Sequence, residues 1–301
     1  MLVENKGYCS QVSSFLFQTA LRQAIEWPRT KRKAYQSLGL IPPRGILLHG
    51  PPGCAKTTLA RAAAGASGVA FLTLSPAEVY ASSYVGEAEA VVRRAFALAR
   101  SSSPCILFFD ELDSIFGGSG DNTHGLGSRG SSAEARVLST FLNEMDGVDG
   151  SGDDGVLVLG ATNRPWTLDS ALLRPGRLGD KIIYVPPPDE LSRRSIIERQ
   201  LSYWSQGASD ETMDNNIDVD VLSSADVSGN MTGAEIVGAC QEASMRILGD
   251  LDLANLSKDT PVALILKQGF LLESFAAVTP LLSKPDALAE FQVFEAGQSA
   301  K

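Results

Sequence analysis

The sequence predicts an α/β protein in which a parallel five-stranded β-sheet lies between helices and is followed by a smaller domain built only from helices. Five short apolar runs alternate with stretches whose apolar residues recur at helical spacing. Such alternation is typical of parallel sheets, because helical crossovers cover both faces and leave the strands apolar throughout. The runs expected to be strands are 46–48, 69–74, 105–109, 155–159 and 181–185.

The triple proline Pro186-Pro187-Pro188 marks a change of pattern. After it, apolar residues recur at helical spacing and no further strand signal follows, so we expect a small all-helical domain. We therefore divide the chain into an atypical N-terminal segment (1–18), an α/β core (19–188) and a helical domain with its tail (189–301).

Helical periodicity locates the other elements of the fold. The helix expected at 19–37 is broken near Trp27-Pro28, and the Gly/Ser-rich segment 117–131 reads as a flexible loop inserted within the core. We expect the tail from Glu290 to be frayed. The remaining expected helices are 56–65, 87–100, 132–145 and 169–173 in the core, and 189–204, 219–225, 232–248 and 270–281 after it.

The composition argues against nucleic-acid-binding, zinc-binding and membrane-spanning proteins. The formal net charge of -9 argues against a broad nucleic-acid surface, because phosphate neutralisation needs clustered Lys and Arg. The four cysteines are scattered and the chain has two histidines, so no zinc-ligand spacing can be assembled. No apolar run approaches the roughly 18 residues of a membrane span. We expect a cytoplasmic or nuclear protein with reduced thiols and without membrane or nucleic-acid partners.

A glycine-rich segment after the first expected strand has the pattern of a phosphate-binding P-loop. Backbone N–H groups of such a loop turn inward around the phosphates, and the helix that follows adds its partial positive charge. Lys56 supplies a cation for the β- and γ-phosphates, and Thr57 offers a hydroxyl to Mg²⁺. An ordinary Gly/Pro turn before a helix is the alternative. The expected nucleotide-binding residues are Gly50, Pro51, Pro52, Gly53, Cys54, Ala55, Lys56, Thr57 and Thr58.

Two carboxylates end the third expected strand and strengthen this interpretation. Asp110 is placed to hold the Mg²⁺ shell, and Glu111 is placed to polarise the attacking water. The alternative is that these two acidic residues only cap the N-terminus of a helix, which would produce the same sequence. Together with Lys56 and Thr57 they indicate an ATP site that uses Mg²⁺.

Ala55 departs from the usual P-loop pattern, which has glycine before the lysine. A methyl group is the smallest possible intrusion, but it strains the loop if this residue needs a positive φ.

At this point the sequence resembles the AAA+ ATPases, and above all the second ATPase ring of valosin-containing-protein-type and Afg-type unfoldases. The resemblance covers about residues 20–295 and implies a P-loop sheet followed by a small helical lid, with ATP and Mg²⁺ as cofactors. A small residue other than glycine before the lysine is itself similar to the Afg-type subgroup. The matching segments are Gly50 to Cys54, Phe108 to Ile115, Gly160 to Pro165 and Leu168 to Arg177.

The resemblance also implies roles for residues outside the P-loop. Asn163 resembles the sensor residue that orients the lytic water, although a turn-forming Asn before Arg-Pro fits the same letters. Arg174 and Arg177 match arginine fingers that reach the ATP site of a neighbouring subunit, and two solvated arginines in a turn are the alternative. The fingers imply a homo-hexamer or a mixed AAA+ ring, in which an isolated monomer hydrolyses ATP poorly.

Three further segments resemble functional parts of the family. Tyr84 and Val85 match a loop that lines the central pore, where an aromatic ring grips an extended polypeptide of almost any sequence. A surface tyrosine in a turn would look the same. Loop 117–131, with Arg129, would be the second pore loop. Gly233 and Ala234 resemble the lid residues that pack against the nucleotide, although a plain helix start after Thr232 explains the same letters.

The chain departs from the family in two places. Residues 1–18 do not resemble it, and Ser10 to Ser14 replace a segment whose backbone contacts adenine, so we expect part of the adenine pocket to be missing and the chain to be truncated or its start misassigned. Leu178 to Lys181 carry one extra residue after the fingers.

The leading functional hypothesis is a motor that threads and unfolds protein, driven by ATP hydrolysis. The alternative is a regulatory or incomplete subunit that binds nucleotide with little turnover, and a nucleic-acid motor is disfavoured by the acidic balance.

Overall fold

The computed structural model describes most of the chain after its N-terminal segment. Residues 1–18, predicted to be atypical, lie outside the described residues. The described residues are 19, 23, 26–40, 42–81, 84, 86–117, 130–148, 155–207, 217–249, 266–284 and 288–299. Among the helices formed by these residues, none combines the length and the apolar character needed to cross a bilayer.

A five-stranded parallel sheet forms the centre of the first half of the chain and confirms the predicted fold class. Its strand order is β2-β3-β4-β1-β5, so β4 lies between β1 and β3 although it follows both in sequence. Each predicted apolar run is a strand, and β4 extends further than predicted. The strands are β1 (Gly45–His49), β2 (Ala70–Leu74), β3 (Cys105–Phe109), β4 (Val156–Thr162) and β5 (Lys181–Tyr184).

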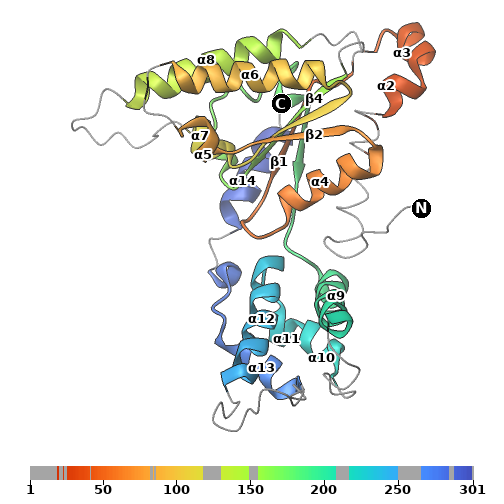
Figure 1. The fold of residues 1–301 in the computed structure, drawn as a ribbon, viewed down its shortest axis with the longest axis vertical. Coiled ribbons are helices and arrows are strands. Elements are labelled where there is room, and N and C mark those ends of the chain that lie inside the picture. The colour runs from red at the N-terminus through yellow and green to blue at the C-terminus, as the bar shows by residue number, and fades with distance from the viewer. Residues whose placement is uncertain are drawn as a thin grey trace, which may run out of the picture.

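Alternate residues of the central strands enter two separate cores, one on each face of the sheet. In β1, Leu47 belongs to the core beneath α6 (Glu87–Ser101) and α8 (Gly130–Asp146), whereas Ile46 and Leu48 belong to the core beneath α4 (Lys56–Ser67). Figure 1 shows α6 and α8 side by side over one face and α4 against the other. Both faces are covered, which explains why the strands are continuously apolar.

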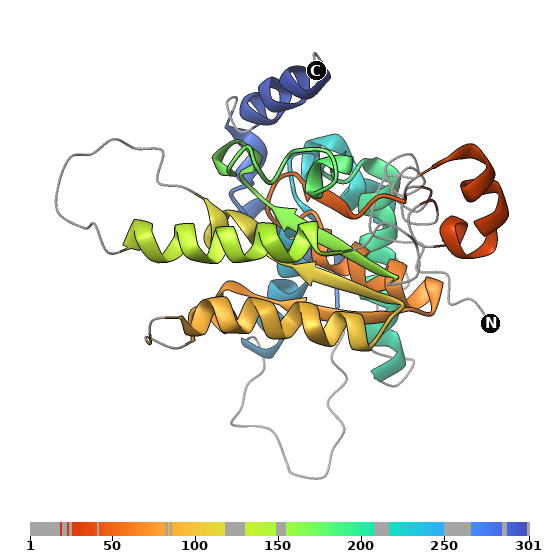
Figure 2. The same ribbon diagram turned by 90° about the horizontal axis from the view of Figure 1, so that it is seen from above.

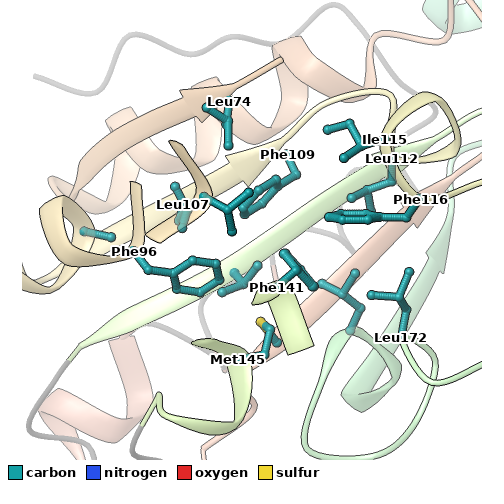
Figure 3. Packing of buried hydrophobic residues seen from close by; sticks show 14 of the residues in the cluster. Leu74, Phe96, Leu107, Phe109, Leu112, Ile115, Phe116, Phe141, Met145 and Leu172 are labelled. Carbon is teal, nitrogen blue, oxygen red and sulfur yellow. The ribbon is translucent and has the colours of Figure 1, made fainter. Parts of the chain in front are cut away.

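Aromatic rings fill the core under α6 and α8. The Phe141 ring lies 5.0 Å from that of Phe109 and 5.8 Å from that of Phe96, measured between ring centroids and in edge-to-face arrangements. Phe116, at the end of α7 (Leu112–Phe116), lies 4.8 Å from Phe141. Figure 3 shows these rings together with Leu107 and Leu112. The packing therefore joins α7, which begins directly after the two carboxylates, to the middle of the domain.

The short elements of the α/β part differ from the prediction in two places. The predicted break near Trp27-Pro28 lies at the start of α2 (Trp27–Thr30), whose first turn contains Pro28, and a second break that was not predicted, at Lys31, separates α2 from α3 (Arg32–Leu38). The helix predicted at 169–173 is wrong, because this segment makes i to i+3 turns. Pro175 disfavours helical backbone at the preceding residue and so limits helix growth here. A further short helix, α5 (Pro76–Val79), precedes Tyr80.

A separate helical core lies below the sheet in Figure 1. Its largest contact joins α12 to α13, around buried residues such as Ile236 and Leu271, and α9 packs against both α10 and α12. The segment predicted at 219–225 divides at Ser224 into two short helices. The helices are α9 (Glu190–Gly207), α10 (Val219–Ser223), α11 (Ala225–Ser228), α12 (Gly233–Gly249) and α13 (Gln268–Ala277).

The frayed tail expected from Glu290 is wrong. Residues Ala289–Ser299 form α14, which lies against the α/β part and not among the other C-terminal helices (Figures 1 and 2). Phe291 is 5% exposed, and its ring lies 5.1 Å from that of Trp166 and 5.9 Å from that of Tyr184. The helix is ordered because its aromatic face is covered by residues more than 100 positions earlier in the chain.

Candidate nucleotide-binding site

The P-loop follows β1 and leads into α4, as predicted, and it fits closely against the helical domain. Gly53 has φ +76°, and a Cβ atom there would lie 2.8 Å from the hydroxyl oxygen of Thr232. The backbone N–H of Ala234, at the start of α12, donates to the Gly53 carbonyl over 3.1 Å. No side chain fits at Gly53, and the loop is joined directly to α12.

Ala55 adopts the left-handed conformation, with φ 61° and ψ 27°. This confirms the condition under which its methyl group strains the loop. A non-glycine residue in this region costs about 1–2 kcal/mol, because Cβ approaches the following carbonyl oxygen. The strain is located directly before the lysine that is expected to hold the phosphates.

Lys56 is 8% exposed, and its ammonium points back across the loop. It donates to the carbonyl oxygens of Gly50 and Pro51, each over 2.8 Å. Burial lowers the pKa of Lys56 from 10.5 to about 8, and electrostatic interactions with Cys54, Asp110 and Asp113 oppose this shift. The site therefore holds a partly desolvated cation, which favours an anionic ligand.

Thr57 and Asp110 join the two halves of the predicted site. The Thr57 hydroxyl donates to Oδ2 of Asp110 over 2.7 Å, and the backbone N–H of Glu111 donates to Oδ1 of Asp110 over 3.0 Å. A hydroxyl and a carboxylate side by side are hard oxygen ligands of the kind that Mg²⁺ prefers, so the donor set fits this ion. Glu111 has φ 47° and an exposed side chain, a strained backbone of a sort that is concentrated at functional sites.

The third side of the site is the end of β4. Because β4 lies between β1 and β3, Asn163 follows the strand that separates the P-loop from the two carboxylates. In open parallel sheets, ligands bind in the crevice outside the carboxyl ends of the strands. The topology thus brings Asn163 to the same edge as Lys56 and Glu111.

Thr232 contacts the P-loop, whereas its sequence pattern predicts only the start of a helix. It does begin α12 through reciprocal bonds with Glu235: the Thr232 N–H donates to Glu235 over 2.7 Å, and the Glu235 N–H donates to the Thr232 hydroxyl over 3.4 Å. It is 1% exposed because it also packs on Gly53. The spacing of Thr and Glu three residues apart before an apolar stretch signals the cap but not the contact.

The two arginines predicted as fingers differ in their surroundings. Arg174 is exposed. Arg177 forms an ion pair with Asp146, at the end of α8, and donates to the Ala171 carbonyl over 2.9 Å. Within one chain, therefore, Arg177 is held by its own subunit. Their role at a neighbouring ATP site stays a prediction.

The predicted pore residues are only partly described. Tyr84 lies just before α6 and is 82% exposed. Val85 and residues 118–129, which include Arg129, lie outside the described residues. The hydroxyl of Tyr80, four residues before Tyr84, donates to the Ile115 carbonyl over 3.0 Å, so the segment before Tyr84 is bonded to α7.

A model of the family described as "ATPase family associated with various cellular activities (AAA)" matches residues 46–187. The chain carries an AAA ATPase domain. The matched residues run from the second residue of β1 to just beyond β5 and include the P-loop and both carboxylates.

Relatives of this AAA chain are similar beyond the matched domain. Cell division control protein 48 homolog B of Arabidopsis thaliana is 46% identical over 74% of the chain and 34% of its own length. ATPase family gene 2 protein homolog A of Homo sapiens is 41% identical over 90% of the chain and 27% of its own length. The human homolog B is 39% identical over 88% of the chain and 34% of its own length. The chain spans about a third or less of each of these relatives.

Proposed function

We propose that this chain binds ATP with Mg²⁺ and hydrolyses it at the edge of the sheet formed by the ends of β1, β3 and β4. The observation that carries the proposal is the 2.7 Å bond between Thr57 and Asp110, which joins the P-loop to the carboxylates at the end of β3. The family match and the ATPase names of the relatives support the same reaction.

Each residue of the site has a separate role in the proposed hydrolysis of ATP. Loop N–H groups and the Lys56 ammonium hold the β- and γ-phosphates, and Glu111 accepts the proton of the attacking water. The Asn163 amide donates to the γ-phosphate without repelling it. Thr57 and Asp110 would hold Mg²⁺, which neutralises charge on the phosphates when it is bound. Ala234 and Thr232 would couple the helical domain, acting as a lid, to the occupied loop.

Two substitutions separate binding from chemistry. Lys56→Ala should abolish binding of Mg²⁺-ATP, whereas Glu111→Gln should keep ATP bound and reduce its hydrolysis by at least about 100-fold. Binding is followed with a fluorescent ATP analogue and hydrolysis by phosphate release. Lys284→Ala and Glu290→Gln are exposed control variants that should match the wild type. Equal loss of binding in Lys56→Ala and Glu111→Gln would contradict the assigned roles.

Assembly of the chain into a homo-hexamer or a mixed ring is the second part of the proposal. The exposed side chain of Arg174 supports it, because such an arginine is available to a neighbouring subunit. An arginine supplied in this way contributes about 10³–10⁵ in rate. Phosphate release per subunit should rise steeply with protein concentration, and Arg174→Ala should remove that rise.

The proposed use of this energy is remodelling or unfolding of a protein threaded past Tyr84. An aromatic side chain that is 82% exposed beside α6 supports this role. Tyr84→Ala should abolish ATP-dependent unfolding of a tagged fluorescent protein while ATP hydrolysis continues. Tyr203→Ala, which removes another highly exposed tyrosine, is the matched control. Unchanged unfolding by Tyr84→Ala would end the threading proposal and leave the ATPase proposal intact.

One observation favours the alternative of a regulatory subunit with little turnover. Ala55 has a strained backbone in the P-loop. Phosphate binding that requires this backbone must offset the strain, which lowers the affinity for ATP. The concentration series decides between the two, since a regulator binds ATP but releases no phosphate at any concentration.

A further inference from the structure

Asp113 is the third carboxylate of the segment that begins with Asp110, and it lies in the first turn of α7. Its Oδ1 atom accepts two hydrogen bonds from the end of β4: one from the Thr162 hydroxyl over 2.8 Å, and one from the backbone N–H of Asn163 over 3.3 Å. A single carboxylate therefore binds the segment that carries Asn163 to the helix whose N-cap is Glu111.

Thr162, the donor in this contact, is itself held by further interactions. Thr162 is 1% exposed, and its hydroxyl oxygen accepts a further hydrogen bond from the Arg164 N–H over 3.0 Å. The backbone on both sides of Asn163 is thus fixed through the Thr162 hydroxyl, and that hydroxyl is fixed by Asp113. Because the carboxylate is charged, its bonds are stronger than those of a neutral acceptor.

Apolar packing holds the same two elements together. Leu112 is fully buried, and a Cβ atom added at Gly160 in β4 would lie 2.3 Å from its Cδ1 atom. The start of α7 and the end of β4 therefore touch without space between them. The packing sets how far apart they lie, and the bonds of Asp113 set the orientation of residues 162–164.

We propose that Asp113 is a positioning residue for ATP hydrolysis, which keeps Asn163 aligned with Glu111 across the γ-phosphate. The inference rests on the proposed function, because it assumes the roles given above to these two residues. Asp113 touches neither the phosphates nor the water in this proposal. Its effect on the reaction passes through the segment that carries Asn163.

The test uses the full chain and measures ATP affinity and turnover separately. Asp113→Ala should lower kcat on the order of 10- to 100-fold, since small misplacement of a reacting group has effects of this size, while Kd for ATP changes less than about threefold. Asp113→Asn should restore most of kcat, because its amide oxygen still accepts both bonds. If this neutral variant restores kcat, then the reaction needs the hydrogen bonds that residue 113 accepts and not its negative charge.

Two further variants make the test specific. Thr162→Val removes the donor at the other end of the contact, should reduce kcat in the same direction, and should add little to Asp113→Ala. It also provides the test if Asp113→Ala fails to fold. Asp218→Ala is the matched control, because Asp218 accepts from two backbone N–H groups at the start of α10, far from the site, and its loss should leave kcat unchanged.

The outcomes distinguish this inference from the proposed function. If the wild-type chain hydrolyses ATP and Asp113→Ala hydrolyses it equally well, the positioning role is wrong and the ATPase proposal stands. A parallel loss of ATP affinity and thermal stability in Asp113→Ala would also overturn the inference, because it would show a general structural role. If Glu111→Gln turns over like the wild type, the proposed function itself fails.

Discussion

The guanidinium of Arg177 meets the carboxylate of Asp146 through two parallel bonds, 3.0 Å from Nε to Oδ1 and 2.7 Å from Nη2 to Oδ2. The hydrogen bond lowers the pKa of Asp146 and raises that of Arg177. Arg177 must leave this partner before it can reach a neighbouring ATP site. The intrachain pair therefore competes with the contact between subunits that we propose.

Loss of the Asp146 carboxylate should release Arg177. The pair is partly exposed, with Asp146 at 54%, so it is worth about 0.5–1 kcal/mol, and Asp146→Ala should raise ATP hydrolysis by the assembled chain up to about fivefold. Phosphate release at saturating ATP measures this effect. Arg177→Ala should be slow with or without Asp146→Ala, and a decrease in Asp146→Ala alone would show instead that the carboxylate holds the arginine ready.

Replacement of Ala55 by glycine should stabilise the protein by about 0.5–1 kcal/mol, because relief of the left-handed strain exceeds the added chain entropy of glycine. The midpoint of thermal unfolding should rise by about 2 °C, and ATP should bind more tightly. The matched control is Ala97→Gly, at an exposed position inside α6, which should lower stability by about 1 kcal/mol. If the two variants shift the midpoint in the same direction, the strain at Ala55 is not significant.

His49 should make stability depend on pH. Its side chain is 1% exposed against Tyr184 and Phe294, and burial, aided by the charge of Lys56, lowers the pKa of His49 from 6.5 to about 4. The unfolded chain binds a proton between these values and the folded chain does not. The contribution is therefore complete above pH 6.5 and is lost as the pH falls towards 4, by about 3 kcal/mol in all.

The variant His49→Phe isolates this contribution. It keeps an aromatic ring at the site but cannot take up a proton, so the decline of the unfolding midpoint between pH 7 and 4.5 should become shallower than in the wild type. Carboxylates elsewhere titrate in both proteins and cancel in the comparison. Parallel pH profiles for the two proteins would show that His49 does not titrate as described.

Removal of the Phe291 ring should detach α14 from the sheet. Phe291→Ala should cost about 3 kcal/mol, the lower end for a buried phenylalanine, because the short helix is free to separate. The emission of Trp166, whose ring is in contact with Phe291, should shift to longer wavelength. Val293→Ala, at a position that is 73% exposed on the same helix, should change stability by less than about 0.5 kcal/mol.

Much of the fold could be predicted because its signals are local. Each strand of the sheet is a short apolar run, since both faces are covered, and the P-loop and the pair Asp110-Glu111 each follow such a run directly. The parallel topology then brings the ends of β1 and β3 to one edge, where Thr57 meets Asp110. For Ala55 the sequence predicted only the condition for strain, and the positive φ that meets this condition comes from the structure.

The parts that could not be predicted depend on partners distant in sequence. The segment that carries Phe291 and Phe294 was predicted to be frayed. Its order depends on aromatic contacts with His49, Trp166 and Tyr184, which are distant in sequence. The pairing of Arg177 with Asp146 joins residues 31 positions apart, and no spacing rule connects them. The turn at 169–173 was missed because its apolar residues have helical spacing while Pro175 limits the helix.

The return of α14 to the sheet has a mechanical consequence for the helices between β5 and α14. This unit is attached to the same body at two places, after Val185 and before Ala289. A rigid unit fixed at two points keeps a single rotation, about the line that joins them. If the proposed reaction moves the loop at Gly53, where the Ala234 N–H of α12 donates to it, we expect this unit to rotate about that one line while Phe291 stays packed against Trp166.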